Sequence, residues 1–546
     1  MVSASATAIA PMSQIPVEIV STIFETIHAD SSISAIGIEV VLSDVCKDWR
    51  AIVLRSPRLW TRILCTRGRL KRGETVLYLQ NSHSLPINLS IHLDDFAITR
   101  DESFAESHHR ESLFRVLSSH FWRINDLLVS CTEDGPLESL LRQLHPITAP
   151  FLRSIDIDCW EHPVSNSFPS IDIFTGGAPK LSEVRFGNLS LKHCQPPLAS
   201  VKAIYCFLDE SNSERFDEYS EAWMARLAAA TSLNFLQIDA ATTVITADWV
   251  GRVELPVLQS LCLSAADNFH EFSWERQNIL QHAVAPCLEV LMLNNFCYFS
   301  PSFEDIRSEN FPSLHTVIFW KANMKFINEE DVEGGYKLLL DNFRRPSIKN
   351  IICGDISKAG CRHLLFTLAL CDSESDAEDA GHYIEGGGGG VEDAGVGDEG
   401  HLRQGEDEKG AEDTQHAGAE LKRPSYLPDL QTLAIIPSNN GWYYPFPLTA
   451  MRRLLVRRKA AGRPIQKVYV TADFLAEVCG EFTSEEGLVQ VEVWRPQLLP
   501  NGHMWPEGIW HISGDCTRER GFKSEDDMDE EVDVGDEVEG RGERYR

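Results

Sequence analysis

Residues 286–294 read PCLEVLMLN, and residues 312–320 read PSLHTVIFW. Both segments place a proline before an apolar triplet, in which two residues separate the first two apolar positions and one residue separates the last two. Eleven such triplets occur along the chain. They are Ile124/Leu127/Val129, Leu152/Ile155/Ile157, Leu181/Val184/Phe186, Val201/Ile204/Cys206, Leu233/Leu236/Ile238, Leu258/Leu261/Leu263, Leu288/Leu291/Leu293, Leu314/Val317/Phe319, Ile348/Ile351/Cys353, Leu430/Leu433/Ile435 and Ile465/Val468/Val470.

The spacing of the triplets predicts a repeat architecture. Successive triplets begin 20 to 35 residues apart, except for one separation of 82 that contains residues 372–420, a 49-residue insert. One short strand per unit of this length is typical of a leucine-rich-repeat solenoid, in which stacked units share one apolar core. We expect the proline to set an extended entry to each strand. A compact α/β domain whose parallel strands share the pattern is the alternative.

The expected fold class is therefore α/β, with parallel strands on one face of the repeats and helices on the other. Residues 218–230 and 333–343 read as such helices. The regular form of the repeat carries an inward asparagine at a position that Leu189 or Phe296 occupies here. We therefore expect an irregular solenoid with a missing or sporadic asparagine ladder.

Residues 15–60 have a different pattern, which predicts short helices. Ile19, Ile23 and Ile27 recur at helical spacing, and a second row contains Val41, Val45 and Trp49. Pro16 suits the first turn of a helix, and the pair Ser56-Pro57 ends the last one. Three helices this short bury little core by themselves, but they can offer apolar faces to helices of another protein.

This segment resembles an F-box, the adaptor-binding module of SCF-type cullin–RING ubiquitin ligases, as found in fungal-type F-box proteins with a degenerate leucine-rich-repeat-like C-terminal domain. IPVEI at 15–19 matches the start of the family pattern, with isoleucine in place of leucine. VCKDWR at 45–50 matches the middle, and SPRLW at 56–60 matches the end. An ordinary helical cap of a larger domain is the alternative. The resemblance implies docking on a Skp-family adaptor through Ile15, Pro16, Ile19, Val45, Cys46 and Trp49.

Composition suggests how the chain is divided. The acidic, glycine-rich insert and the acidic C-terminal tail contain too few apolar residues to offset the entropy of ordering, so we expect both to be disordered. Residues 503–512, which are aromatic, could cap the open end of the repeats. The expected division is a flexible N-terminus at 1–12, the F-box-like domain at 13–65, the first part of the solenoid at 66–371, the insert at 372–420, the last repeats and cap at 421–520 and the tail at 521–546.

Charge, apolar runs and cysteine usage disfavour several classes of protein. The net charge is −31, of which 372–420 contribute −14 and 525–546 contribute −8. A mildly acidic remainder without a basic stripe disfavours nucleic-acid binding. No apolar run approaches the length of a membrane span, and the N-terminus lacks the features of a signal peptide. The 14 cysteines form no CxxC framework, so we expect reduced thiols in the cytoplasm or nucleus.

No catalytic motif is present: the chain has no GxSxG, P-loop, GxGxxG after a strand or HExxH. We therefore expect no enzyme activity, cofactor or metal. We interpret His108-His109 as surface, Cys46 as packing within an adaptor-facing helix, and the basic cluster at 452–459 as a solvated helix face. Candidates for partner anchors are Trp160, Trp320, Trp442, Tyr443 and Tyr444.

Together these features predict a monomeric substrate-recognition subunit of a cullin–RING ligase. The F-box would bind the Skp-family adaptor, and the repeats would bind a target protein whose identity the sequence does not indicate. The alternative function is a non-catalytic repeat scaffold whose F-box acts outside a ubiquitin ligase.

Overall fold

The computed structural model describes most of the helices and strands that the sequence predicts. The chain forms two compact units, one comprising Met1–Ile238 and Gln497–Arg546, the other Asp239–Pro496. The described residues are 15–30, 37–71, 73–94, 114–159, 164–165, 167–207, 220–239, 251–264, 279–294, 307–320, 348–356, 358–370, 427–437, 446–482 and 489–494. The expectations for 1–12, 333–343, 372–420, 503–512 and 521–546 lie outside these ranges.

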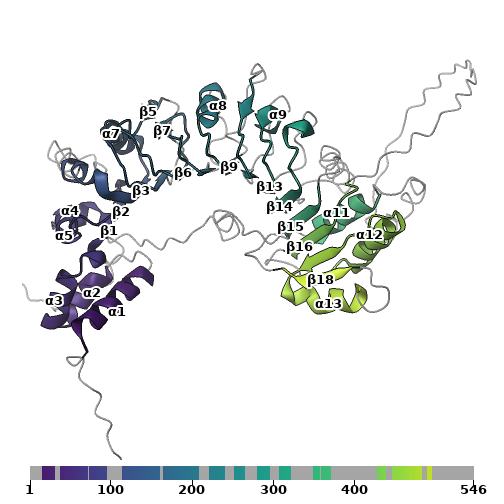
Figure 1. Ribbon diagram of the computed structural model, residues 1–546, viewed down its shortest axis with the longest axis horizontal. Helices are drawn as coiled ribbons and strands as arrows, with labels where there is room; N and C mark the ends of the chain where they lie inside the picture. Colours follow the sequence, from purple (N-terminus) through teal and green to yellow (C-terminus); the bar gives the residue numbers. More distant parts are fainter. Residues whose placement is uncertain are drawn as a thin grey trace, which may run out of the picture. The chain divides into compact units, whose positions relative to one another are not determined.

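The first unit begins with three short α-helices and a 3₁₀ turn, followed directly by a parallel sheet (Figure 1). The helices are α1 (Val17–Asp30), α2 (Ile38–Val45) and α3 (Lys47–Leu54), and the turn is η2 (Pro57–Trp60). The strands pair in chain order as β1 (Arg62–Cys65), β2 (Ile87–His92), β3 (Ile124–Cys131), β4 (Ser154–Cys159), β6 (Glu183–Gly187), β8 (Ala203–Phe207) and β9 (Phe235–Asp239). Between them lie α4 (Arg67–Lys71), α5 (Glu74–Asn81), η4 (Phe121–Arg123), α7 (Asp134–Leu144), α8 (Ser220–Ala228) and the pair β5 (Ile171–Asp172) and β7 (Cys194–Gln195).

The second unit has the same kind of sheet. Its strands pair in chain order as β11 (Ser260–Ser264), β13 (Val290–Asn294), β14 (Thr316–Trp320), β15 (Asn350–Ile356), β16 (Thr432–Pro437), β17 (Lys467–Val470) and β18 (Gln490–Val493). The other described elements are α9 (Ile279–His282), η8 (Ser308–Asn310), α11 (Lys358–Leu370), α12 (Leu448–Ala460), α13 (Ala472–Phe482) and the pair β10 (Val253–Glu254) and β12 (Ala283–Val284). The chain is thus a mixed α/β protein built on parallel strands, as the apolar triplets predict.

The apolar triplets also set the register of the strands. Their second residues are direct partners from strand to strand in the first unit, and their third residues pair likewise. In the second unit the same alignment continues from β11 to β17. Strands β1, β2 and β18 extend the two rows with Ile63, Leu89 and Val491, which stand outside the eleven triplets.

The prolines before the triplets act in turns rather than in extended segments. The amide of Leu288 donates to the carbonyl of Ala285 at 3.1 Å, and the amide of Leu314 donates to that of Phe311 at 3.1 Å. Each proline therefore occupies the second position of a four-residue turn, where its φ near −65° fits. The expected extended entry was wrong, because the proline instead reverses the chain immediately before the strand.

Asn188 links neighbouring units through their backbone groups. Asn188 Nδ2 donates to the carbonyl of Cys159 at 2.7 Å, and the Asn188 backbone amide donates to that of Phe207 at 2.7 Å. Asn188 stands one residue before the position that the regular repeat uses, and its φ of 56° is one that asparagine tolerates. Leu189 is buried instead. This contact fits a sporadic asparagine ladder rather than a continuous one.

The two faces of the strands are not buried equally along the first unit. Strands β4 and β6 alternate between buried and half-buried residues, as expected when one face packs on a core and the other faces water. The alternation is lost in β8, and in the second unit β11, β13 and β14 are buried at every position. In the second unit, α11 contacts β15.

Candidate functional site

Helices α1, α2 and α3 form a small cluster with its own interior. Val20, Phe24, Leu42 and Val53 are buried, and Trp49 packs on Phe24 with ring centroids 4.8 Å apart. The buried side chains Leu59 and Trp60 from η2 complete this interior. The spacing of four residues in α1 and α3 puts these side chains on the inner faces of the helices.

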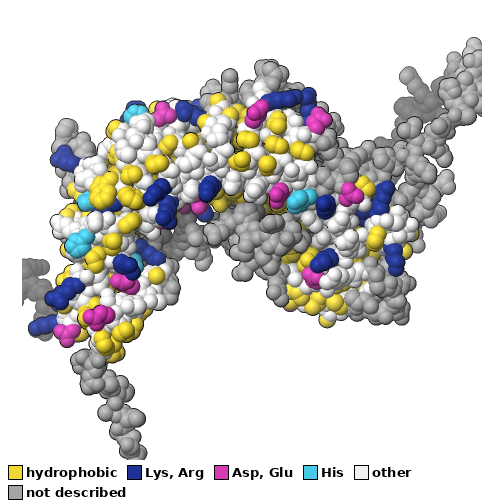
Figure 2. Space-filling model, viewed as in Figure 1, with side chains coloured by type: hydrophobic (Ala, Val, Ile, Leu, Met, Phe, Trp, Pro, Cys, Tyr) yellow, Lys and Arg dark blue, Asp and Glu magenta, His cyan; other side chains and the backbone are white. Residues whose placement is uncertain are grey.

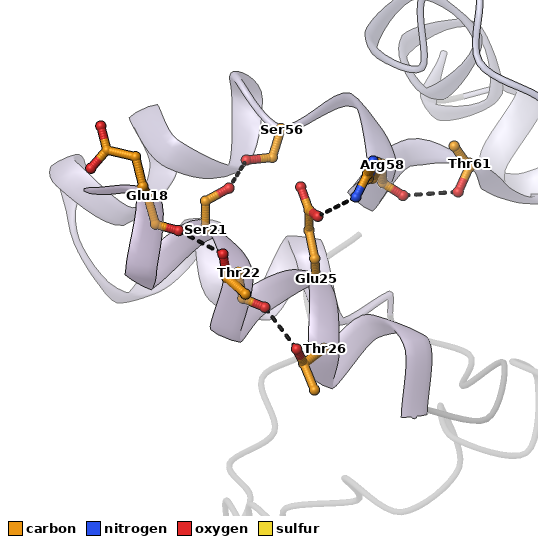
Figure 3. Close-up of polar contacts among 8 residues, drawn as sticks. All are labelled: Glu18, Ser21, Thr22, Glu25, Thr26, Ser56, Arg58 and Thr61. Carbon is orange, nitrogen blue, oxygen red and sulfur yellow. Dashed lines mark hydrogen bonds and ion pairs between the residues drawn. The ribbon is translucent and has the colours of Figure 1, made fainter. Parts of the chain in front are cut away.

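Polar contacts hold α1 against the end of α3 and the turn that follows (Figure 3). Ser21 Oγ and Ser56 Oγ lie 2.9 Å apart, and Glu25 Oε2 accepts from Arg58 Nη1 at 3.1 Å. Ser56 Oγ also donates to the carbonyl of Ile52 at 2.9 Å, which satisfies one of the last carbonyls of α3. Residues 33 and 35 positions apart in sequence therefore fix how α1 lies on the other helices.

The outer surface of this cluster is unusually apolar. Ile19 is 53% exposed and Val45 is 57% exposed. Eight of the thirteen large exposed hydrophobic side chains among the described residues lie on α1, α2 or α3. They are Val17, Ile19, Ile23, Ile27, Val40, Val41, Val45 and Leu54. In Figure 2 hydrophobic side chains lie on this region among charged ones. Such a concentration makes this surface a candidate interaction site.

The residues that the F-box resemblance selects fall into two groups. Pro16, Ile19 and Val45 are exposed on the surface of the cluster. Ile15 and Trp49 are half-buried, and the Trp49 ring contributes to the interior through Phe24. Ile23, Ile27 and Val41 are exposed too, but they are not part of the set that the resemblance selects. Their four-residue spacing, which continues the rows of Ile19 and Val45, is the sequence signal that could have added them.

The interpretation of Cys46 as a packing residue within a helix was wrong. It stands between α2 and α3 with extended φ and ψ angles of −162° and 170°, and it is exposed. Its Sγ accepts from the backbone amide of Trp49 at 3.4 Å. Cys46 therefore caps α3, because the first amides of a helix lack partners within the helix. It breaks the row of Val41, Val45 and Trp49 into two helices.

A buried polar cluster joins the helices to the start of the sheet. Tyr78 Oη donates to Glu39 Oε1, and the Tyr78 ring packs edge-on against Trp60 with centroids 4.9 Å apart. Arg62 Nη2 donates to the carbonyl of Ala29 at 2.9 Å. Burial raises the pKa of Glu39 even though Tyr78, Arg69 and Arg62 favour its charged form. Only Thr61 separates η2 from β1, so the helical cluster and the first strand are directly connected.

A cavity of about 180 Å³ lies at this junction. Side chains from α1, α2, α4 and the first three strands line it, including Glu39, Arg69, Asn88 and Asp126. His28 also lines it, and burial together with Arg62 lowers the pKa of His28 to about 4. The imidazole is therefore neutral near pH 7.

The half-exposed face of β3, β4 and β6 is the second candidate surface. Asp126, Asp156, Asp158 and Glu183 line it, and all four are half-buried acidic residues. Arg185 lies among them, with Nε 2.5 Å from Glu183 Oε1. The face is therefore acidic and remains accessible to a partner.

Two other predicted surface features prove structural. Arg458 in the basic cluster is fully buried, and its Nη2 donates to the carbonyl of Leu427 at 3.0 Å. Arg457 Nη1 donates to the carbonyl of Ala369 at 3.3 Å. The prediction of a solvated helix face was thus wrong for Arg458, whose guanidinium satisfies backbone carbonyls. Trp320 is buried over Gly354, where a Cβ would come within 2.0 Å of the indole.

The other residues singled out in the sequence do not form a further site within the described ranges. Four of the candidate partner anchors lie outside the described residues, as does the pair His108-His109. These four are Trp160, Trp442, Tyr443 and Tyr444. Within the described ranges, no group of three or more histidine, cysteine, aspartate or glutamate side chains is placed to hold a metal ion. Cys159, Cys206, Cys262 and Cys353 are buried and form no disulfide bond, as the sequence indicates.

Comparison with known proteins adds no family assignment. No family model matches the chain, and no curated protein matches its sequence. Among the described helices, none is long and apolar enough to cross a membrane.

Proposed function

We propose that the chain is the substrate-recognition subunit of an SCF-type cullin–RING ubiquitin ligase. In this proposal α1, α2 and α3 are an F-box that docks on a Skp-family adaptor. The strands and their connecting helices are an irregular leucine-rich-repeat-like solenoid that binds a target protein. The single observation that carries the proposal is the concentration of exposed apolar side chains on α1–α3, in the segment that resembles the F-box pattern.

The energetics favour a protein partner for this surface. Burying apolar area contributes about 25 cal/mol per Å², so several valine and isoleucine side chains can supply much of an interface. Pro16, Ile19 and Val45 belong to the F-box pattern. Ile23 and Ile27 continue the surface by one and two helical turns along α1, and Val41 continues it by one turn along α2. Trp49 supports the surface from within by packing on Phe24.

The chain itself would perform no chemistry. Its contribution would be proximity, because a target held on the same chain as the adaptor is present at a high effective concentration near the conjugating enzyme. The direct connection from η2 to β1 and the Glu39–Tyr78 contact support this role, since they restrict motion between the F-box and the first repeats. The half-exposed acidic face of β3, β4 and β6 is the surface proposed for the target.

The proposal is tested by capture of the Skp-family adaptor with the full-length chain. Ile19→Asp and Val45→Asp place a charge on the docking surface without touching the interior, and each should reduce adaptor binding more than 100-fold. Val456→Asp is the matched control, since Val456 is also an exposed apolar side chain on a helix but lies on α12. Unchanged capture by the Ile19→Asp, Val45→Asp double variant, with an unchanged circular dichroism spectrum, would refute the assignment.

A scaffold that uses its F-box outside a ubiquitin ligase is the second candidate. It would also bind the adaptor, because the same apolar surface would be used. Cullin in the captured complex, and accumulation of the bound partners when the proteasome is inhibited, distinguish the ligase subunit from the scaffold.

A further inference from the structure

The cavity at the junction of the helices and the sheet has a floor made by the first three strands. Ile63, Leu89 and Leu127 belong to one inward row, so the residues on either side of them face outward. Strand pairing arranges these outward residues in two rows that line the cavity. One row is Arg62, Asn88 and Asp126, and the other is Leu64, Ser90 and Leu128.

The first row carries charges of opposite sign at its two ends. Arg62 lies on β1 and Asp126 on β3, so their backbones are two strand spacings, or about 10 Å, apart. Both residues are half-buried, and Asn88 between them is exposed. The row therefore offers donors at one end, an amide that donates and accepts in the middle, and an acceptor at the other end.

The contacts of the two charged residues indicate which groups they can bind. Asn125 Nδ2 donates to Asp126 Oδ2 at 2.7 Å, and Ser154 Oγ donates to Oδ1 at 2.6 Å. Because both donors are neutral, neither bond cancels the charge of the carboxylate, and a cationic group suits this end of the row. At the other end, Arg62 donates to the carbonyl of Ala29. A guanidinium has five donors, so it can bind a carboxylate while it keeps this bond.

The second row is more deeply buried and mostly apolar. Leu64 and Ser90 are buried and Leu128 is half-buried, while Ile38 adds an apolar wall from α2. The volume of about 180 Å³ is slightly larger than that of an engineered cavity of about 150 Å³ that binds benzene. The cavity therefore suits a ligand of roughly eight non-hydrogen atoms with an apolar part.

The other ionisable groups at the cavity disfavour a ligand with a single sign of charge. Arg69 is paired with Glu74 at 3.8 Å, and burial lowers the pKa of His28 to about 4, so neither adds an uncompensated positive charge near pH 7. The carboxylate at one end of the first row would repel a phosphate, and the guanidinium at the other end would repel a simple amine. A ligand that carries both charges avoids both conflicts.

We propose that this cavity binds a small zwitterion, an amino acid of about the size of valine, with its carboxylate on Arg62, its ammonium group on Asp126 and its side chain over Leu64 and Leu128. Because α1 and α2 line the same cavity as β1, β2 and β3, a bound ligand also stabilises the junction between the helices and the sheet. The site makes no use of the outer surface of the helices, so the inference stands whether or not they bind an adaptor.

Calorimetric titration of the full-length chain with L-valine tests the site. Valine should bind and raise the melting temperature. Two analogues, 3-methylbutanoate, which lacks the ammonium group, and 2-methylpropylamine, which lacks the carboxylate, should each bind at least about tenfold more weakly, because each loses one charged contact. A cavity that holds water only would give neither heat nor stabilisation with millimolar valine. That result, equal binding of the three compounds, or tighter binding of inorganic phosphate would overturn the proposal.

Two substitutions distinguish a loss of the site from a loss of folding. Asp126→Asn should weaken valine binding about tenfold and leave that of 3-methylbutanoate unchanged, because only the contact with the ammonium group is removed. Arg62→Met should weaken the binding of valine and 3-methylbutanoate but not that of 2-methylpropylamine. Asp172→Asn, at an exposed position on β5 of the same unit, is the control and should change none of these affinities. Equal losses for all three compounds in Asp126→Asn would refute the assignment of the two ends.

Discussion

The helical cluster α1–α3 and the sheet that follows it use apolar residues in opposite ways. In β4 and β6 the apolar side chains point inward and the outward positions are aspartate, serine, glutamate and arginine. In α1 one apolar row, Val20 and Phe24, points inward, while a second row, Ile19, Ile23 and Ile27, faces water. The apolar side chains of β4 and β6 are covered within the chain, whereas a row of apolar side chains on α1 is exposed. This difference is what the proposed adaptor-binding role requires.

Substitutions at two adjacent residues of α1 test this difference with the largest expected effect. Phe24→Ala should lower the free energy of unfolding of the helical cluster by about 3–5 kcal/mol, because it empties a buried site beneath Trp49. Ile23→Ala should change stability by less than about 0.5 kcal/mol yet weaken adaptor binding, because Ile23 is 44% exposed. Urea unfolding and calorimetric titration with the adaptor measure the two effects. Equal stability losses would contradict the assignment of the two rows.

The first layers of the sheet depend on a buried arginine, which has no counterpart in the helical cluster. Arg123 Nη1 donates to Ser82 Oγ at 3.0 Å and to the Leu85 carbonyl at 2.9 Å, and Nη2 donates to the Leu79 carbonyl at 2.8 Å. Arg123→Met should cost about 3 kcal/mol, because these buried acceptors lose their donor. Thermal unfolding measures the loss. Arg115→Met, at an exposed position nearby, should have little effect.

The junction between the two regions should be sensitive to acid. Burial lowers the pKa of His28 to about 4, below the 6.5 of the unfolded chain, so protonation favours unfolding. The stabilisation is complete above pH 6.5 and is lost as the pH falls toward 4, by up to about 3 kcal/mol for this histidine. His193 has its pKa lowered to about 4 in the same way. His28→Asn should therefore remove about half of the combined pH dependence, and an unchanged slope would contradict the burial of His28.

The smallest expected effect concerns the serine pair that ties α1 to the end of α3. Ser56→Ala removes the contacts with Ser21 Oγ and the Ile52 carbonyl and should cost about 1 kcal/mol. Adaptor affinity should fall with it, because the exposed rows of α1 and α2 lose their fixed relation. Ser118→Ala, which removes an exposed hydroxyl contact, is the control for chemical denaturation.

Much of the fold could be predicted because strand register follows from local pattern. A triplet such as Leu127 and Val129 places two side chains on one face, and a shift of one residue would turn both toward water. The candidate site was harder to predict. Helical periodicity identified Ile19, Ile23, Val20 and Phe24 as apolar, but two apolar rows on one short helix do not indicate which row is inside.

The environments of Cys46 and Arg458 could not be predicted from the sequence around them. Cys46 became a helix cap because the backbone turns between α2 and α3, and no residue type there signals the break. Arg458 was expected in solvent with its charged neighbours. It is buried because the Leu427 carbonyl, 31 residues earlier, needs a donor.

The sequence by itself determined that this chain builds parallel strands in register, since alternation and period are local properties that any fold of these units must satisfy. It also determined the residue pattern that resembles an F-box. Tertiary structure alone decided which apolar row of α1 faces water, where the outward face of the sheet stops being open, and which arginines are buried. The physical reason is that burial depends on what packs against a residue, and those neighbours come from distant parts of the chain.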